Sequence, residues 1–252
     1  MRWYANGCFD LPSGSRLADE AVKQTGLFDR FDQVRLDSQW LQFDGTEDNQ
    51  YIPAAMARIC VYSGSSFGAS PEYATAAAVL ATTCARRGLG IVYGGSSAGL
   101  MGVLADAALA AGCEVIGVIP RTMIAEERAH DRLTQLIPVE SMHERKERMA
   151  QLSDSFVALP GGIGTLEEVI EIFTWLQLGL HLKPVGILNA AGFYDPLLQL
   201  LDHMRDEGFL TPAHRAMLTV ERDSESLLNR LAAIKHEFVP KVSIRDDKGL
   251  LK

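Results

Sequence analysis

The 252-residue sequence has only four cysteines, which form neither a CxxC pair nor a regular spacing. Neither a zinc knuckle nor a disulfide framework is therefore indicated, and the expected location is a reducing cytoplasm. No segment approaches 18 continuous apolar residues, and no apolar stretch follows a basic start, so we expect no membrane partner and no export. Positive charge is also scarce, because the sequence has 24 lysines and arginines but 32 aspartates and glutamates. This balance argues against a protein that binds nucleic acid by neutralising phosphates.

The overall composition is typical of a globular protein, with 47% hydrophobic and 22% charged residues. At roughly 150 residues per domain, the length allows one large domain or one domain with an appendage. Residues 1–57 are acidic and contain aromatic residues, so we expect an N-terminal extension with partial docking or short helical pieces. Met56 leaves open whether this extension is genuine or an early start was assigned. Residues 58–252 are expected to form the main domain, with a short polar C-terminal tail.

From residue 58 onward, short apolar runs alternate with helical patterns, as in repeated strand–helix units. Strands are predicted at 59–62, 90–93, 115–119, 136–139, 156–159 and 184–188. Helices are predicted at 71–87, 99–109, 141–152, 166–178, 194–207, 212–217 and 224–234. Nearly continuous apolar strands are typical of a parallel sheet buried on both faces. We therefore predict an α/β protein with Rossmann-like architecture, a doubly wound parallel sheet with helices on both faces.

Three glycine-containing turns, at Gly64, Gly94–Gly99 and Gly161–Gly164, each join a predicted strand to a helix. In a parallel sheet these turns share one edge, where free N–H groups and helix dipoles favour an anion. Any single turn could equally be a tight connection, but three together favour a ligand that carries a phosphate. The spacing around Gly94 differs from the dinucleotide fingerprint, and no acidic residue ends the second strand, so a nicotinamide cofactor is not predicted.

The third turn leads into Thr165, Glu167 and Glu168. Thr165 could donate its hydroxyl to the anion, cap a helix that begins near Leu166, or do both. Acidic residues in a first helical turn are favourable for dipole reasons alone. A carboxylate beside a phosphate is nevertheless electrostatically costly, so it also suggests chemistry that needs negative charge near a cationic transition state.

The segment Met142–Arg148 precedes that strand and carries both signs of charge at helical spacing. One interpretation is an exposed helix held by pairs such as Glu144 with Arg148, four residues apart. Alternatively, Arg145 could bridge the ligand and an active-site glutamate, because guanidinium groups pair well with phosphate and carboxylate.

Two motifs now form a recognisable pattern. Residues 160–168 read PGGxGTxxE, and residues 142–146 read MHxRK. Together they resemble the LOG ("Lonely Guy") family of cytokinin riboside 5′-monophosphate phosphoribohydrolases, over about residues 57–236. The resemblance implies hydrolysis of the N-glycosidic bond of a purine nucleoside 5′-monophosphate, which releases the free base and ribose 5-phosphate. Such cleavage builds oxocarbenium-like positive charge on the ribose, which a carboxylate stabilises.

The resemblance also implies roles for individual residues. Glu168 would act near the ribose and help orient water, and Arg145 would work with it as the second catalytic residue. Gly162, Ile163, Gly164 and Thr165 would hold the 5′-phosphate. The other candidate substrate-binding residues are Glu127, Lys146, Gly161, Glu167, Thr174, Gly64, Gly94 and Gly95. No metal and no organic cofactor is expected, and the family implies a homodimer.

Some alternatives stay open at this stage. The second turn reads Gly94-Gly95-Ser96 where relatives usually have a third glycine, which could narrow the approach of the backbone to the ligand. The substrate could be AMP or a related purine nucleotide used in salvage. A non-catalytic protein that carries a nucleotide-like cofactor, as molybdenum-cofactor carriers do, is the alternative from another class. A pyridoxal-dependent decarboxylase is not predicted, because Lys146 and Lys183 lack the surroundings of a Schiff-base lysine.

Overall fold

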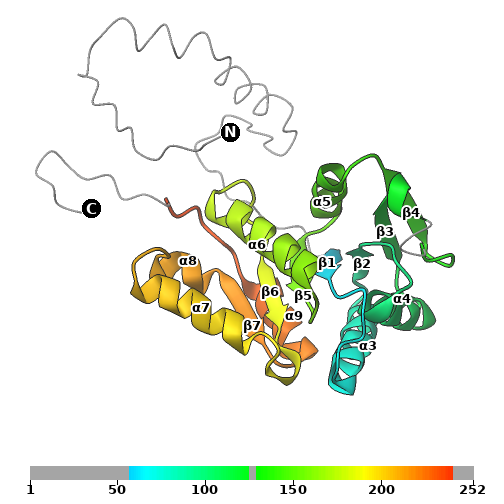
Figure 1. Cartoon of the computed structure of the whole chain (residues 1–252), viewed down its shortest axis with the longest axis horizontal. Coiled ribbons are helices and arrows are strands. Elements are labelled where there is room, and N and C mark those ends of the chain that lie inside the picture. Colours follow the sequence, from blue (N-terminus) through cyan, green and yellow to red (C-terminus); the bar gives the residue numbers. More distant parts are fainter. Residues whose placement is uncertain (1–56, 125–128, 241–252) are drawn as a thin grey trace, which may run out of the picture. The chain divides into compact units, whose positions relative to one another are not determined.

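The computed structural model describes residues 57–124 and 129–240. Within them the chain forms a seven-stranded sheet with the order β4-β3-β2-β1-β5-β6-β7, in which each neighbouring pair is parallel (Figure 1). The strands are β1 Arg58–Tyr62, β2 Gly90–Tyr93, β3 Val115–Pro120, β4 Gln135–Val139, β5 Ser155–Ala158, β6 Val185–Leu188 and β7 Leu218–Glu221. The order reverses between β1 and β5, so the crevice expected at a topological switch point lies beyond the carboxyl ends of these two strands.

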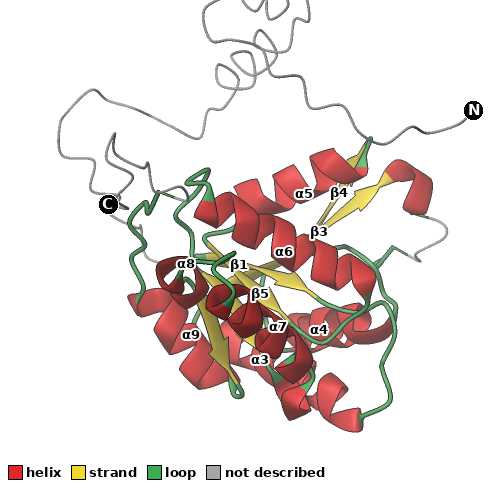
Figure 2. Cartoon of the chain, turned by 60° about the vertical axis from the view of Figure 1, so that its left-hand side comes forward, coloured by secondary structure: helices red, strands yellow, loops and turns green. Residues whose placement is uncertain are grey.

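Helices connect the strands and cover both faces of the sheet (Figure 2). The α-helices are α3 Pro71–Arg86, α4 Gly99–Ala110, α5 Met142–Gln151, α6 Ile163–Gln177, α7 Asp195–Asp206, α8 Pro212–Ala216 and α9 Ser224–Ala233. Two short 3-10 turns, η1 Arg121–Met123 and η2 Ala190–Gly192, lie between elements. None of the helices in the described residues is both long and apolar enough to cross a membrane.

Alternate residues of β1 divide the core into two layers. Ile59 and Val61 pack with buried residues of α3, α4 and α9 on one face of the sheet. Cys60 and Tyr62 pack with buried residues of α5, α6 and α7 on the other face. Both layers exclude water, and this explains why the strands are apolar without alternation. The predicted doubly wound α/β architecture is therefore confirmed.

The sequence located six of the seven strands and missed β7. Its four residues, Leu-Thr-Val-Glu, follow α8 after a single residue, and two of them are only half-buried. A strand this short at a sheet margin has little periodicity to distinguish it from the end of a helix. The extension predicted at residues 1–57 and the predicted polar tail lie almost wholly outside the described residues, so these remain predictions.

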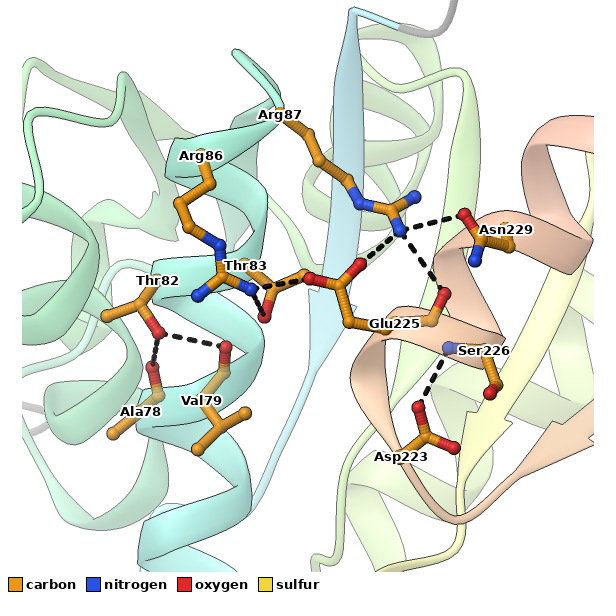
Figure 3. Close-up of polar contacts among 10 residues, drawn as sticks. All are labelled: Ala78, Val79, Thr82, Thr83, Arg86, Arg87, Asp223, Glu225, Ser226 and Asn229. Carbon is orange, nitrogen blue, oxygen red and sulfur yellow. Dashed lines mark hydrogen bonds and ion pairs between the residues drawn. The ribbon is translucent and has the colours of Figure 1, made fainter.

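The end of α3 is tied to α9 by a charged cluster (Figure 3). Glu225 accepts hydrogen bonds from Arg86, at 2.5 Å, and from Arg87, which also donates to the side chain of Asn229 at 2.8 Å. Asp223 caps α9 by accepting a hydrogen bond from the backbone N–H of Ser226. These contacts join helices that are nearly 140 residues apart in sequence and hold α9 against the same face of the sheet as α3.

The two margins of the sheet are short strands. β4 has five residues and contains Pro138, which lacks a backbone N–H. β7 has four residues. Proline within a sheet is confined largely to such edge positions, so Pro138 agrees with the place of β4 at the margin.

Candidate active site

The N-terminus of α6 is open to solvent and has no side-chain cap. Gly162 is the N-cap residue, and no side chain of the described residues accepts a hydrogen bond there. Gly162 and Gly164 are exposed, and Ile163 is 82% exposed. A Cβ atom at Gly162 or Gly164 would meet nothing within 4 Å. The first N–H groups of a helix have no partner within it, so this end offers donors, positive dipole and space to an anion.

Some N-terminal N–H groups of the neighbouring helices are paired with acceptors of the protein. The carbonyl oxygen of Gly64 accepts from the backbone N–H of Leu100 at 3.0 Å and of Met101 at 3.3 Å, in the first turn of α4. Ser70 caps α3, and Ser141 caps α5. Two N–H groups at the start of α4, those of Leu100 and Met101, are therefore already paired with Gly64.

The other glycines of the turns allow close packing of the site. Gly64 donates its N–H to the carbonyl of Pro160 at 3.1 Å, which joins the β1 turn to the β5 turn. A Cβ at Gly161 would lie 2.2 Å from Oγ1 of Thr165 and 2.8 Å from the nitrogen of Gly64. Thr165 is 4% exposed and lies within the first turn of α6, which begins at Ile163. The alternative in which Thr165 caps a helix near Leu166 was therefore wrong.

Arg145 is buried beneath the end of β2, with 5% of its surface exposed. Its Nη2 donates to the carbonyl oxygen of Gly94 at 3.0 Å, and Nη1 lies 3.7 Å from Sδ of Met142. A Cβ at Gly94 would lie 2.2 Å from Nη2, so any larger residue there would require the guanidinium to move. Gly95 has φ +80°, a conformation that favours glycine, and a Cβ there would lie 3.4 Å from Cβ of Ile119.

The remaining charges on α5 mostly form local contacts. Glu144 accepts from the backbone N–H of Glu140 at 2.7 Å, and Arg148 donates to Gln151 at 3.1 Å. The helix is thus exposed along most of its length, as one interpretation expected, while Arg145 turns inward.

Glu168 lies in the second turn of α6, not in the first as predicted, because the helix begins three residues earlier than the sequence indicated. At 1.5 Å rise per residue, Glu168 stands roughly 8 Å along the helix axis from Ile163. Its side chain is partly exposed. Burial raises the pKa of the Tyr62 and Tyr194 hydroxyls, and the charge of Glu168 raises both further. Because Glu168 lies beyond the first turn of α6, the helix dipole alone does not account for a carboxylate at this position.

Arg145 and Glu168 lie on the same face of the sheet. Burial raises the pKa of the Cys60 thiol, the Glu168 carboxylate raises it further, and the Arg145 guanidinium lowers it. Both charges are thus close enough to act on one side chain in the middle of β1. The two residues that the motifs singled out thus come from different helices that cover the same face of the sheet.

Lys146 connects the two motif helices. Its Nζ donates to Oε1 of Glu167 at 2.6 Å and to Oε1 of Glu171 at 2.9 Å, and its side chain is 12% exposed. Burial lowers the pKa of Lys146, but the two carboxylates outweigh burial and raise it above its ordinary value. α5 and α6 accordingly lie side by side in both views (Figures 1 and 2).

Two predicted residues are not joined to this group by the described contacts. Thr174 lies roughly 16 Å along the axis of α6 from Ile163, and its hydroxyl donates to the carbonyl of Ile170 at 2.8 Å. Glu127 lies outside the described residues. The sequence missed Tyr194, whose hydroxyl donates to the carbonyl of Leu159 at 2.7 Å just before the β5 turn. A single tyrosine after a predicted strand gives no signal of such a contact.

Comparison with known proteins agrees with the family resemblance of the two motifs. A family model described as "Possible lysine decarboxylase" matches residues 101–231. LOGL3 of Oryza sativa subsp. japonica, a probable cytokinin riboside 5′-monophosphate phosphoribohydrolase, is 45% identical over 73% of this chain and 85% of its own length. LOG7 of Arabidopsis thaliana, a cytokinin riboside 5′-monophosphate phosphoribohydrolase, is 44% identical over 72% of this chain and 83% of its own length.

Solved structures with the same fold are more distant. The molybdenum cofactor binding protein of Rippkaea orientalis is 21% identical, with a TM-score of 0.54 over 69% of this chain and 94% of that one. The molybdenum cofactor carrier protein of Chlamydomonas reinhardtii is also 21% identical, with a TM-score of 0.54 over 71% and 99%. These likenesses concern the fold alone. The high identity to the plant enzymes, over most of both chains, is what assigns the family: this chain belongs to the LOG family.

Proposed function

We propose that the protein hydrolyses the N-glycosidic bond of cytokinin riboside 5′-monophosphates and releases the free base and ribose 5-phosphate. The observation that carries this proposal is the arrangement of α6, which has an uncapped, open N-terminus and a carboxylate, Glu168, roughly 8 Å further along. One helix thus provides a place for the phosphate and a negative charge for the sugar.

The phosphate end of the substrate would bind first to α6. Backbone N–H groups of Ile163, Gly164 and Thr165 have no acceptor within the helix, and they would donate to the phosphate oxygens. The space beside Gly162 and Gly164 lets these oxygens approach the backbone. This site accepts any 5′-monophosphate and therefore does not by itself select the base.

The sugar would lie between Glu168 and Arg145. As the bond between C1′ and the base nitrogen breaks, the bonding electrons leave with the base and positive charge develops on the ribose. The Glu168 carboxylate stabilises that charge and orients a water molecule. The water oxygen bonds to C1′, and its proton balances the negative charge on the departing base. Arg145, which is held by its hydrogen bond to Gly94, keeps Glu168 and the substrate in place relative to each other.

Lys146 and Glu167 take a different part in this proposal from the one that the sequence suggested. Because they are paired with each other, they serve the site by joining α5 to α6. Gly64, Gly94, Gly95 and Gly161 likewise act through packing. Glu127 and Thr174 keep their proposed substrate contacts on the strength of the family resemblance alone.

The first experiment is to incubate the purified protein with AMP and with isopentenyladenosine 5′-monophosphate, and to follow free base and ribose 5-phosphate by chromatography. We expect release from the prenylated nucleotide, with the ratio of kcat/KM for the two substrates ranking the base preference. Faster cleavage of AMP would favour a salvage nucleosidase. Binding of both nucleotides without cleavage of either would contradict the proposed hydrolase and favour a carrier.

We further propose that the protein is a cytoplasmic homodimer, as the family resemblance implies. The three described cysteines, Cys60, Cys84 and Cys113, are free and buried, which suits a reducing compartment. Light scattering coupled to size-exclusion chromatography tests the assembly: a mass of about twice 27.6 kDa is expected, and a monomer that retains full turnover would contradict it.

A further inference from the structure

His130 is a buried histidine that the proposed chemistry does not use. It is 4% exposed and follows β3 in the chain, next to the short antiparallel bridge between Ser96 and Ala129. Its backbone N–H donates to the carbonyl of Gly95 at 2.9 Å. The segment that contains His130 is thereby fastened to the turn after β2.

Hydrogen bonds on both ring nitrogens fix the state of this imidazole. The backbone N–H of Arg132 lies 3.2 Å from Nδ1 and can only donate, so Nδ1 is the acceptor. The single proton of the neutral ring is then on Nε2, which donates to Oδ1 of Asp106 at 3.2 Å. Asp106 belongs to α4 and is also paired with the Arg132 guanidinium. The ring therefore links α4 to the segment that holds Gly95.

The turn that His130 holds is the one on which Arg145 rests. Gly94 accepts the hydrogen bond from Nη2 of Arg145, and the next carbonyl along the chain, that of Gly95, accepts from the backbone N–H of His130, whose ring holds the same segment to α4. The space at Gly94 is so limited that a single added carbon would lie 2.2 Å from the guanidinium. A small displacement of this turn must therefore move the Arg145 side chain or break its hydrogen bond.

We infer that His130, oriented by Asp106, is a positioning residue that sets the place of the Arg145 guanidinium through the Gly94–Gly95 turn. This inference rests on the proposed function only for its kinetic consequence. The site has two separable parts, because the phosphate would bind to α6, which His130 does not contact through any described hydrogen bond. Loss of His130 therefore lowers kcat while leaving KM nearly unchanged.

The kinetic test uses His130→Ala, His130→Asn and Arg145→Ala. We expect His130→Ala to lower kcat roughly 10- to 100-fold, as a misplacement of about 1 Å does elsewhere. His130→Asn should recover part of the loss, because its amide oxygen can accept from Arg132 in place of Nδ1. In the Arg145→Ala background, His130→Ala should have little further effect. Independent, additive losses, or a rise in KM equal to the fall in kcat, would overturn the inference.

A second measurement does not depend on turnover. Arg145 is buried in the wild type, whereas Arg148 on the same helix is exposed. Treatment with phenylglyoxal, followed by peptide mass spectrometry, measures how accessible each guanidinium is. We expect His130→Ala to increase the modification rate of Arg145 and not that of Arg148.

Equal Arg145 rates in the wild type and the variant would overturn the inference even if the enzyme proves inactive on every nucleotide tested. If His130→Ala fails to fold, as judged by circular dichroism, Asp106→Ala removes the acceptor of the Nε2 hydrogen bond and provides the same comparison with the ring retained. The proposed function fails separately, if the wild type cleaves no nucleotide while its Arg145 stays protected.

Discussion

At the scale of single residues, the site contains two kinds of glycine. Some allow other atoms of the protein to pack closely, and others leave space that a ligand could occupy. Gly161 is packed against Thr165 and Gly64, whereas Gly162, the next residue, faces open space. The sequence presents them as one glycine pair. Their different surroundings give each a different expected response to the addition of one methyl group.

Gly161→Ala and Gly162→Ala form a matched pair. Because the new Cβ at Gly161 would overlap Thr165, we expect that variant to lose about 1–3 kcal/mol of unfolding free energy. Gly162→Ala should keep wild-type stability but raise KM roughly tenfold, as loss of one hydrogen bond to a charged phosphate would. Urea unfolding and steady-state kinetics measure the two effects. Equal stability losses in both variants would contradict the assignment of the open space to the phosphate.

Glu168→Gln tests the proposed chemistry, since it removes a charge at nearly constant shape. We expect kcat to fall roughly 10²- to 10³-fold, the usual effect of losing one electrostatic stabiliser of a transition state. Binding of ribose 5-phosphate, measured by calorimetry, should stay near the wild-type value because the phosphate site is retained. Turnover like that of the wild type would sink the proposed role of this carboxylate.

At the scale of elements, the two sequence motifs correspond to two helices that are physically joined. The sequence placed α5 and the turn before α6 correctly, because caps, glycines and apolar strands leave local signals. It could not give the pairing of Lys146 with Glu167 and Glu171, which depends on how the two helices lie beside each other. The predicted start of α6 was also three residues late, because Gly162 and Gly164 at the start of the helix do not favour helical structure.

Lys146→Met should loosen that junction. The variant keeps most of the apolar stem but leaves Glu167 and Glu171 without their shared cation, so we expect a loss of about 1–2 kcal/mol of stability. It should also reduce kcat several-fold, because Arg145 and Glu168 lie on the two helices concerned.

The contribution of the Lys146 ion pairs to stability should depend on pH. The folded-state pKa of Lys146 is raised, so its contribution is complete below about 10.5, the ordinary value, and is lost as pH rises through the folded pKa. Thermal unfolding at pH 8 and pH 11 should therefore separate wild type and Lys146→Met more at pH 8. Lys146→Arg is the control that retains the charge, and an equal gap at both pH values would contradict the role of the ion pairs.

At the scale of the whole molecule, the sequence identified the fold class and most strands because both faces of the sheet are buried. It failed where the information is not local. Strand β7 carries almost no periodicity of its own. The occupation of the α4 N–H groups by Gly64 depends on two loops that meet only in the folded chain. The anion site at the glycine turns itself stays a prediction.

Acid should destabilise the molecule through a buried histidine. Burial is the main cause that lowers the pKa of His181 to about 4, with Lys183 and His236 acting in the same direction. Because the folded-state pKa lies below the unfolded one, this contribution to stability is complete above about pH 6.5 and is lost as pH falls toward 4. We expect a loss on the order of 3 kcal/mol over that range.

Urea unfolding at pH 7 and pH 4.5 measures this loss. His181→Gln, which cannot gain a proton, should show a flatter dependence of unfolding free energy on pH than the wild type. His203, which is exposed on α7, provides the control substitution His203→Gln for the removal of a histidine as such. If His181→Gln leaves the slope unchanged, acid sensitivity arises elsewhere.

The margins of the sheet have a consequence for how copies of this chain behave when crowded. A ribbon of many molecules grows when the free edge of one sheet accepts a strand from the next. Here one edge has a donor missing at Pro138, and the other is only four residues long. Neither offers a continuous row of donors and acceptors, so concentrated protein should resist fibre growth, and association should proceed through helical surfaces.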